Sequence, residues 1–259
     1  MSQKNIIIFG QTGSGKSSVV NLMAGEEKAK TSYGLEHCTL RWEEHLISFN
    51  GYDFKVFDTA GIDEPQLGID EFLSVIQNSY NLIMELQKQG GGIDLLLFCV
   101  RAGRFTAATQ SNYRLFYEFM CQKKVPIVLV VTGLEREPHM DDWWTESKPI
   151  FDRSGVVVDG HACITAIQEM AWRLRYEESR YLIRDLVLKH CCGNEGPRTM
   201  GDSWFQKFLS ALVMKVLHRR HPFTRKEAVS VLTERCGMPQ EAAVRLANTM
   251  KQDFQKRAT

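Results

Sequence analysis

The chain has 259 residues, of which 44% are hydrophobic and 24% are charged, and its formal net charge is +1. This length fits one large α/β domain, with or without a small helical appendix, and the average composition excludes wholesale disorder, collagen and coiled coils. The near-zero charge argues against binding to nucleic acid, which needs a basic surplus. We find no apolar run long enough to span a membrane and no secretory signal. With seven cysteines, we therefore expect reduced thiols and a cytoplasmic location.

Apolar periodicity predicts alternating strands and helices over the first 190 residues. In chain order these are a strand over 4–9, a helix over 17–24, strands over 40–49 and 52–57, a helix over 66–89, a strand over 93–100, a helix over 107–123, strands over 125–131 and 161–165, and a helix ending near residue 190. Asn50-Gly51 is a strong hairpin signal. The continuous apolar runs IDLLLFCV and VPIVLVV are typical of strands buried on both faces of a parallel sheet. The fold class predicted is α/β, a doubly wound, mostly parallel sheet with helices on both faces.

Glycines and a proline in residues 191–201 (CCGNEGPRTMG) mark a boundary. We expect the α/β domain over residues 1–190, a linker over 191–201 and a small helical appendix over 202–259. Residues 204–217 carry a broad apolar face, which favours a helix docked on its own domain. The alternative is a helix that lies on a membrane surface or binds a partner.

A phosphate-binding motif lies between the first strand and the first helix. The segment GQTGSGKS, residues 10–17, fits G-x-x-x-x-G-K-[ST]. In such a loop, backbone N–H groups and the helix N-terminus surround the phosphates, Lys16 contacts the β- and γ-phosphates, and the Ser17 hydroxyl binds Mg²⁺. The predicted nucleotide-binding residues of this segment are Gly10, Gln11, Thr12, Gly13, Ser14, Gly15, Lys16, Ser17 and Ser18. The alternative is a glycine-rich turn that binds nothing.

The sequence Asp58-Thr59-Ala60-Gly61 ends the strand predicted over 52–57. Asp58 can hold Mg²⁺ through a water molecule, and Gly61 can donate its N–H to a γ-phosphate because a glycine backbone approaches closely. Mg²⁺ is thus the predicted cofactor. The alternative is an ordinary turn at the end of a strand.

The P-loop, the DTAG segment and the later Gly103-Arg104-Phe105-Thr106 together resemble the septin-related AIG1 (immune-associated) and Toc GTPases over residues 4–190. The resemblance implies GTP and GDP as ligands and a nucleotide-dependent homodimer. It also implies that the arginine of the G-R-x-T box, here Arg104, acts in catalysis across the dimer interface, with Arg101 as a second candidate. A purely structural Arg104 is the alternative.

A GTPase of this kind also needs a threonine or serine before its hairpin to contact Mg²⁺. The resemblance favours Thr39, and Thr31 and Ser32 are the other candidates. The position of the glutamine that orients the attacking water in small GTPases is taken by Ile62, so we expect slow unaided hydrolysis.

GTPases read guanine with N-K-x-D at the end of a strand, and here the strand over 125–131 ends in Thr132-Gly133-Leu134-Glu135. Glu135 can supply the carboxylate that accepts from guanine, and Thr132 takes the place of the asparagine. Gly133 lacks the alkyl stem that lysine lays over the base. Guanine is favoured, and adenine, weak base specificity or a merely solvated Glu135 are the alternatives. Thr165-Ala166 is the candidate for a second base contact.

Three functions follow from these residues. The first is a slow GTPase or nucleotide-dependent dimerising switch, which Arg104 favours. The second is a GTP-binding interaction module whose output is the dimer rather than turnover, which Ile62 favours. The third, an ATP-binding P-loop protein, is disfavoured by the DTAG segment.

Overall fold

The computed structural model describes residues 3–29, 42–59, 61, 78–79, 82–83, 85–103, 105–121, 123–192 and eight positions between 226 and 244. The elements are β1 (Lys4–Gly10), α1 (Lys16–Ala24), β2 (Glu43–Phe49), β3 (Tyr52–Asp58), β4 (Leu95–Arg101), α3 (Ala107–Tyr113) continued by a π-helical segment (Arg114–Met120), β5 (Ile127–Thr132), α4 (Asp142–Arg153), β6 (Gly160–Cys163), a short 3₁₀ turn (Met170–Trp172) and α5 (Arg173–Cys191).

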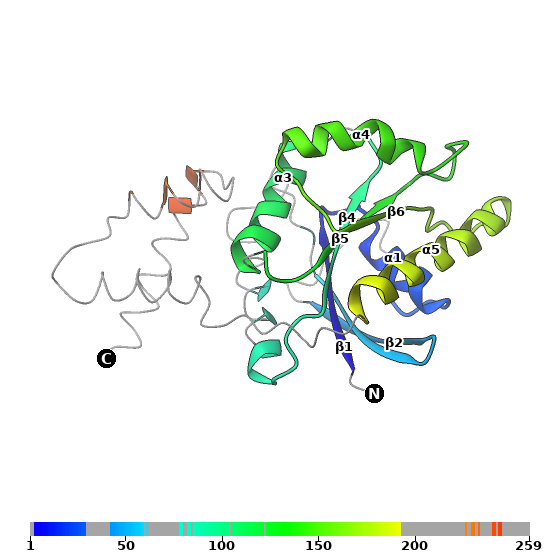
Figure 1. Ribbon diagram of the computed structural model, residues 1–259, viewed down its shortest axis with the longest axis horizontal. Helices are drawn as coiled ribbons and strands as arrows, with labels where there is room; N and C mark the ends of the chain where they lie inside the picture. Colours follow the sequence, from blue (N-terminus) through cyan, green and yellow to red (C-terminus); the bar gives the residue numbers. More distant parts are fainter. Residues whose placement is uncertain are drawn as a thin grey trace.

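The six strands form one sheet in the order β2-β3-β1-β4-β5-β6 (Figure 1). Only β2 is antiparallel to its neighbour, and the other pairs are parallel. The predicted doubly wound, mostly parallel sheet is confirmed. Because the chain moves from β1 outward to β3 and then crosses to β4, the winding direction reverses between β1 and β4. In open α/β sheets, ligands bind beyond the carboxyl ends of the strands at this switch point.

Helices cover both faces of the sheet, as predicted (Figure 1). Helices α1 and α5 pack on one face against buried side chains such as Ile8 and Val130. Helices α3 and α4 pack on the other, where the ring of Phe9 stacks on Phe98 at 5.0 Å and on Phe116 at 4.5 Å between centroids. Burial of β1, β4 and β5 on both faces explains their uninterrupted apolar sequences.

The predicted hairpin is present between β2 and β3. Asn50 and Gly51 have φ angles of 51° and 79°, the two positive values that a type I′ turn requires. The strand begins at Glu43 rather than at residue 40, and residues 40–41 lie outside the described part. The residues described between 78 and 88 are helical, in agreement with the helix predicted there, and the rest of that segment is not described.

Two helical segments differ from the prediction. The helix expected over residues 107–123 is α-helical only to Tyr113 and continues with π-helical hydrogen bonding, seen where the Cys121 N–H donates to the Phe116 carbonyl. Helix α4 was not predicted. Its buried side chains, Trp144 and Phe151, are seven positions apart, which is a helical spacing, but Pro149 lies between them, and a proline inside a segment normally argues against a helix.

The predicted division at residues 191–201 stays a prediction. Helix α5 ends at Cys191, and residues 193–225 lie outside the described part of the chain. The apolar face over 204–217 lies outside the described residues. Further along, Val229 and Ala243 are buried in the same apolar cluster as Phe98. Among the described residues, no helix has both the length and the apolar character needed to cross a membrane.

The Tyr113 hydroxyl joins α3 to the segment after α4, since it donates to the Val157 carbonyl at 2.8 Å and accepts from the Val157 N–H at 3.0 Å. Tyr113→Phe should lower the free energy of unfolding by about 1–3 kcal/mol, because both backbone groups lose their partner. Urea unfolding measures this. Tyr181→Phe, at a site that is 71% exposed, is the control and should change nothing; equal stability of the two variants would contradict the prediction.

Candidate functional site

The loop that joins β1 to α1 is built around glycines. Gly13 and Gly15 have φ angles of 73° and 87°, and a Cβ added to Gly10 would lie 2.2 Å from the Cys99 carbonyl oxygen. No side chain caps the N-terminus of α1. The first N–H groups of the helix therefore face the loop, as in a site that binds a phosphate.

Lys16, the first residue of α1, is only 8% exposed, and its Nζ donates to the Gln11 carbonyl at 3.1 Å within the loop. The next residue faces β3, where the Ser17 Oγ donates to Asp58 Oδ2 at 2.6 Å. Parallel pairing of β1 with β3, with Ile8 opposite Asp58, brings these groups together across 41 positions of sequence. The predicted Ser17 and Asp58 thus lie side by side.

Asp58 is partly buried and lies near Lys16. Burial raises its pKa, and the attraction of Lys16 and the hydrogen bond from Ser17 oppose that rise. Its Oδ1 is buried without a hydrogen-bond partner among the described residues. An unmatched carboxylate oxygen next to a serine hydroxyl suits Mg²⁺, which prefers oxygen ligands and keeps some of its water. Ser17 and Asp58 therefore fit the predicted cofactor, whereas Thr39 lies outside the described residues.

The DTAG segment is fastened to β1 and lies against the P-loop. The Thr59 hydroxyl and N–H both donate to the Ile8 carbonyl, at 3.0 and 3.2 Å. A Cβ added to Gly61 would lie 2.5 Å from the Thr12 nitrogen. Gly61 is thus placed where only a glycine fits, against the loop that would hold the phosphates.

The G-R-F-T box follows β4 and touches the P-loop. Thr106 caps α3 by accepting from the Thr109 N–H at 3.1 Å, and its hydroxyl also accepts from Gln11 Nε2 at 3.1 Å. Phe105 packs edge-on against Phe151. Arg104 lies outside the described residues, so the structure gives the positions of its neighbours only, and its catalytic role stays a prediction.

The loop after β5 is tied to the P-loop and to α5. The Thr132 hydroxyl donates to the Ser14 carbonyl at 2.8 Å. The guanidinium of Arg175 donates to the carbonyls of Glu135, Glu137 and Pro138. Sequence reasoning missed Arg175, since an arginine 40 residues away carries no motif. This clamp fixes the backbone that presents the predicted base-reading carboxylate of Glu135.

The predicted second base contact, Thr165-Ala166, stays a prediction. Thr165 is completely buried, and its hydroxyl accepts from the Ile167 N–H at 3.3 Å. Ala166 is only partly buried. Of this pair, Ala166 alone keeps an exposed surface for a base.

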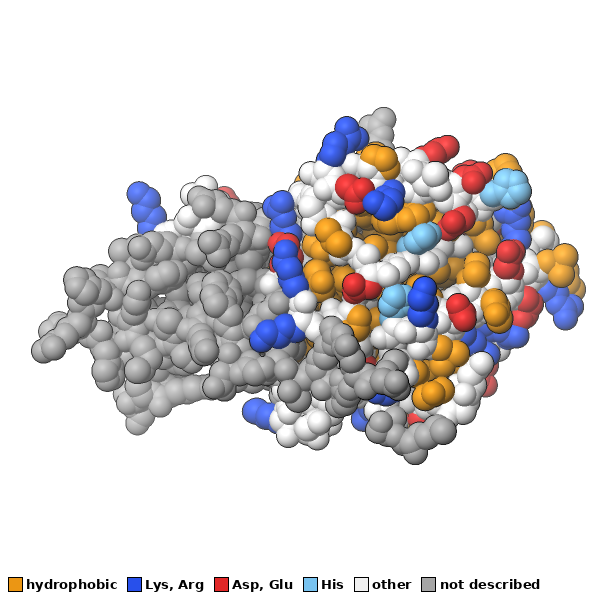
Figure 2. Space-filling model, in the orientation of Figure 1, with side chains coloured by type: hydrophobic (Ala, Val, Ile, Leu, Met, Phe, Trp, Pro, Cys, Tyr) orange, Lys and Arg blue, Asp and Glu red, His pale blue; other side chains and the backbone are white. Residues whose placement is uncertain are grey.

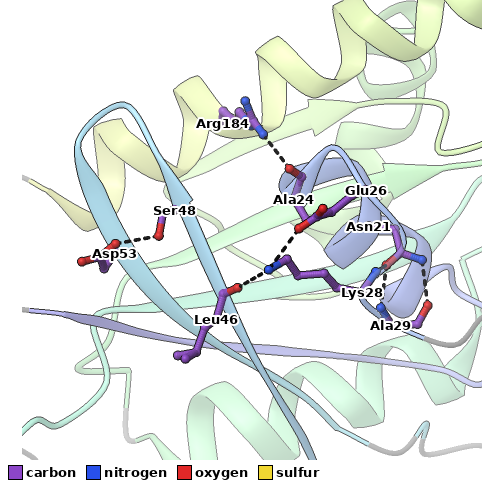
Figure 3. A network of polar contacts seen from close by, with 9 residues as sticks. All are labelled: Asn21, Ala24, Glu26, Lys28, Ala29, Leu46, Ser48, Asp53 and Arg184. Atoms are coloured by element: carbon purple, nitrogen blue, oxygen red, sulfur yellow. Dashed lines mark hydrogen bonds and ion pairs between the residues drawn. The ribbon is translucent and has the colours of Figure 1, made fainter.

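The chain that leaves α1 toward the predicted switch threonine is also fixed (Figure 3). Asn21 Oδ1 accepts from the N–H groups of Lys28 and Ala29 at 2.8 and 2.7 Å, and Asn21 Nδ2 donates to the Ala29 carbonyl. The guanidinium of Arg184 donates to the Met23 carbonyl at 2.8 Å. It also donates to the Ala24 carbonyl at the end of α1, the contact drawn in Figure 3. These contacts hold the end of α1 and residues 28–29 in place.

Comparison with protein families agrees with this geometry. Residues 5–133 match the family model described as 50S ribosome-binding GTPase. The matched segment contains the P-loop, the DTAG segment and the G-R-F-T box, within the fold described above. The fold and this match together support a P-loop GTPase. In the structure its sheet extends beyond the matched segment to β6. No curated protein sequence matches the chain.

Solved structures share the fold of this GTPase domain at low identity. Era in complex with MgGDPNP and nucleotides of 16S ribosomal RNA has 16% identity and a TM-score of 0.57, covering 86% of this chain and 69% of its own. Aquifex aeolicus Era bound to GDP and AlF₄⁻ has 16% identity and a TM-score of 0.55, with 85% and 69% covered. Toc33 from Arabidopsis thaliana with GDP and Mg²⁺ has 17% identity and a TM-score of 0.50, with 77% and 88% covered. These likenesses show the fold.

Within the GTPase domain, the carboxyl ends of the central strands bring most of the predicted residues to one edge of the sheet. The P-loop follows β1, Asp58 ends β3, the G-R-F-T box follows β4 and Thr132 ends β5. The membership in the AIG1 and septin-related group that the sequence suggested stays a prediction.

Proposed function

We propose that this chain binds Mg²⁺·GTP and GDP at its P-loop and acts as a slow GTPase or nucleotide-dependent dimerising switch. The contact between Ser17 and Asp58 beside the buried Lys16 carries the proposal, because it joins a phosphate loop to an unmatched carboxylate oxygen. The family match supports guanine nucleotides, as do the nucleotides with magnesium named for Era and Toc33. Lys16 would neutralise phosphate charge, and Ser17 and Asp58 would hold the metal.

Calorimetry in Mg²⁺ with GTP, GDP and ATP tests this proposal on the full chain. We expect GTP and GDP to bind and ATP to bind much more weakly, because Glu135 would accept from the N–H groups of guanine, which adenine does not offer. Lys16→Ala is the matched loss-of-binding control. Uptake of ATP in preference to GTP would favour the alternative ATP-binding protein, and uptake of neither nucleotide would overturn the proposal.

The proposed dimer and its hydrolysis rest on the box after β4. The contact from Gln11 to Thr106 holds this box against the P-loop, so a second subunit facing the nucleotide would meet Arg104. A Toc33 variant with one arginine replaced by alanine is named dimerisation-deficient. With Ile62 unable to orient water, an arginine supplied by the partner would provide the missing charge, an effect worth about 10³ to 10⁵ in rate in other GTPases.

Single-turnover hydrolysis measured across protein concentration tests the dimer. We expect a rate that rises steeply with concentration in the wild type, and a low, flat rate in Arg104→Ala. Arg153→Ala, which removes an exposed arginine at the end of α4, should behave as the wild type. A flat, negligible wild-type rate with intact GTP binding would favour the alternative, a GTP-binding interaction module.

The surface charge and the free cysteines support the proposed partners and location of the chain. Figure 2 shows acidic and basic side chains interspersed over the described part of the face that it draws, rather than one basic surface. With a net charge of +1, this supports a partner other than nucleic acid. The five described cysteines are free thiols, which supports a cytoplasmic location.

A further inference from the structure

The end of β5 carries a glycine where the guanine-reading motif has its lysine, and a neighbouring side chain occupies the adjoining space. Gly133 has a φ angle of 82°, in the left-handed region. A Cβ built on Gly133 would lie 3.5 Å from Cγ and 3.7 Å from Nε of Arg101. The stem of Arg101 therefore runs past Gly133, beside the point from which a lysine stem would start.

Strand pairing places Arg101 at this point. Arg101 ends β4 and lies opposite Thr132, which ends β5, and the Ala102 N–H donates to the Thr132 carbonyl at 2.8 Å. The Thr132 hydroxyl in turn reaches the Ser14 carbonyl of the P-loop. Arg101 is exposed, and its strand β4 lies between β1, which leads into the phosphate loop, and β5, which leads into the base-reading loop. That is the side of the sheet where winding reverses and ligands bind.

We propose that Arg101 covers one face of the bound purine, in the role that the lysine stem has in N-K-x-D. The inference rests on the proposed nucleotide binding. An arginine offers both an apolar stem and a planar guanidinium, and that plane stacks on the face of an aromatic ring. Every purine has such a face, so the stack adds affinity without identifying the base.

Base identity would then come from Glu135, whose backbone is held by Arg175. The two roles separate in experiment. A stacking residue changes the affinity for every purine nucleotide by the same factor, whereas the carboxylate that reads guanine changes the ratio between GTP and ATP. This division explains how the loop after β5 could work without a lysine.

Calorimetry in Mg²⁺ with GDP, a non-hydrolysable GTP analogue and its ATP counterpart tests the inference on the full chain. Arg101→Ala should weaken binding of GDP and of the GTP analogue by the same factor, about tenfold, because both share the base. Arg101→Lys, which keeps an alkyl stem, should lose less. Glu135→Gln is the matched control and should reduce the preference for guanine over adenine. Unchanged thermal melting of the unliganded variants checks the fold.

A double variant that restores an alkyl stem gives a second test of the inference. Gly133→Lys in the Arg101→Ala background should recover part of the lost affinity, because it restores a stem over the base. Wild-type affinity in Arg101→Ala, or a loss confined to the triphosphate, would overturn the inference while leaving the proposed function intact. Intact affinity with reduced turnover would overturn it too, because Arg101 would then be a catalytic arginine. If the wild type bound no nucleotide, the proposed function would fall and the inference with it.

Discussion

Asp58→Asn is expected to weaken the binding of Mg²⁺·GTP by about 10–100-fold, the range seen when a residue that orients a metal's ligands is lost. The unliganded protein should be at least as stable as the wild type. Burial raises the pKa of Asp58 despite Lys16 and Ser17, so the ionised carboxylate is less favourable in the folded chain than in the unfolded one. Asparagine removes that charge and can still accept from the Ser17 hydroxyl.

The sign of the pH dependence follows from the same shift. A carboxyl group with a raised pKa holds its proton longer in the folded state, so the stability of the unliganded wild type falls as pH rises from the ordinary carboxyl pKa to the raised one. Asp58→Asn should remove this part of the slope. Thermal melting of the unliganded protein across pH, with calorimetry of Mg²⁺·GTP at neutral pH, measures both effects.

Asp94→Asn is the matched control, because it also removes a buried carboxylate from the central sheet. Asp94 is fully engaged, since it accepts from Lys4 Nζ at 3.0 Å and from the Asn5 N–H at 2.8 Å. Its replacement should lower the free energy of unfolding by about 1–3 kcal/mol and leave nucleotide affinity unchanged. If Asp58→Asn were instead the more destabilised of the two and bound Mg²⁺·GTP normally, Asp58 would be a structural residue.

The contrast between these two aspartates shows what sequence could predict here. The spacing of the P-loop and the position of Asp58 at the end of an apolar strand are local patterns, and both led to the correct place in the fold. Whether a carboxylate is matched by donors depends on partners far along the chain. Asp94 and Asn5 are 89 positions apart, so no local pattern shows that the Asp94 carboxylate is paired and that one oxygen of Asp58 is not.

The sequence predicted the presence of strands β4 and β5 correctly but misplaced their ends. Strands β4 and β5 start two residues later than expected and end one residue later, at Arg101 and Thr132. Apolar runs show where a strand is buried, but pairing with the neighbouring strand decides where it stops, and these two residues pair with each other. This pairing matters for the site, because it places Arg101 beside Gly133.

Contacts between loops were beyond sequence reasoning. The hydrogen bond from Thr132 to Ser14 spans 118 positions, and the clamp from Arg175 holds backbone carbonyls, which no side-chain pattern reveals. The glycine at the second position of the base motif suggested, from sequence alone, that the contact made by the lysine was lost. In the folded chain the adjoining space is filled from another strand, so the loss of a motif residue need not mean the loss of its function.

Gly61→Ala should remove the preference for a third phosphate. We expect affinity for a non-hydrolysable GTP analogue to fall about tenfold to a hundredfold, the effect of losing a hydrogen bond to a charged group, with GDP affinity nearly unchanged. An added Cβ would lie 2.5 Å from the Thr12 nitrogen and 2.6 Å from its Cα. These are backbone atoms, so the DTAG segment must move away and carry its N–H out of reach of a γ-phosphate.

Two further variants isolate this effect. Thr12→Ala should not rescue Gly61→Ala, because it removes the hydroxyl but leaves the nitrogen and Cα in the way. Gly13→Ala meets no atom within 4 Å but has a φ angle of 73°, so its cost is backbone strain in the P-loop and should weaken GDP and the GTP analogue alike. Calorimetry with both nucleotides in Mg²⁺ compares the ratios. If Gly61→Ala left that ratio at the wild-type value, Gly61 would not sense the γ-phosphate, and a nucleotide-dependent switch would have to depend on another residue.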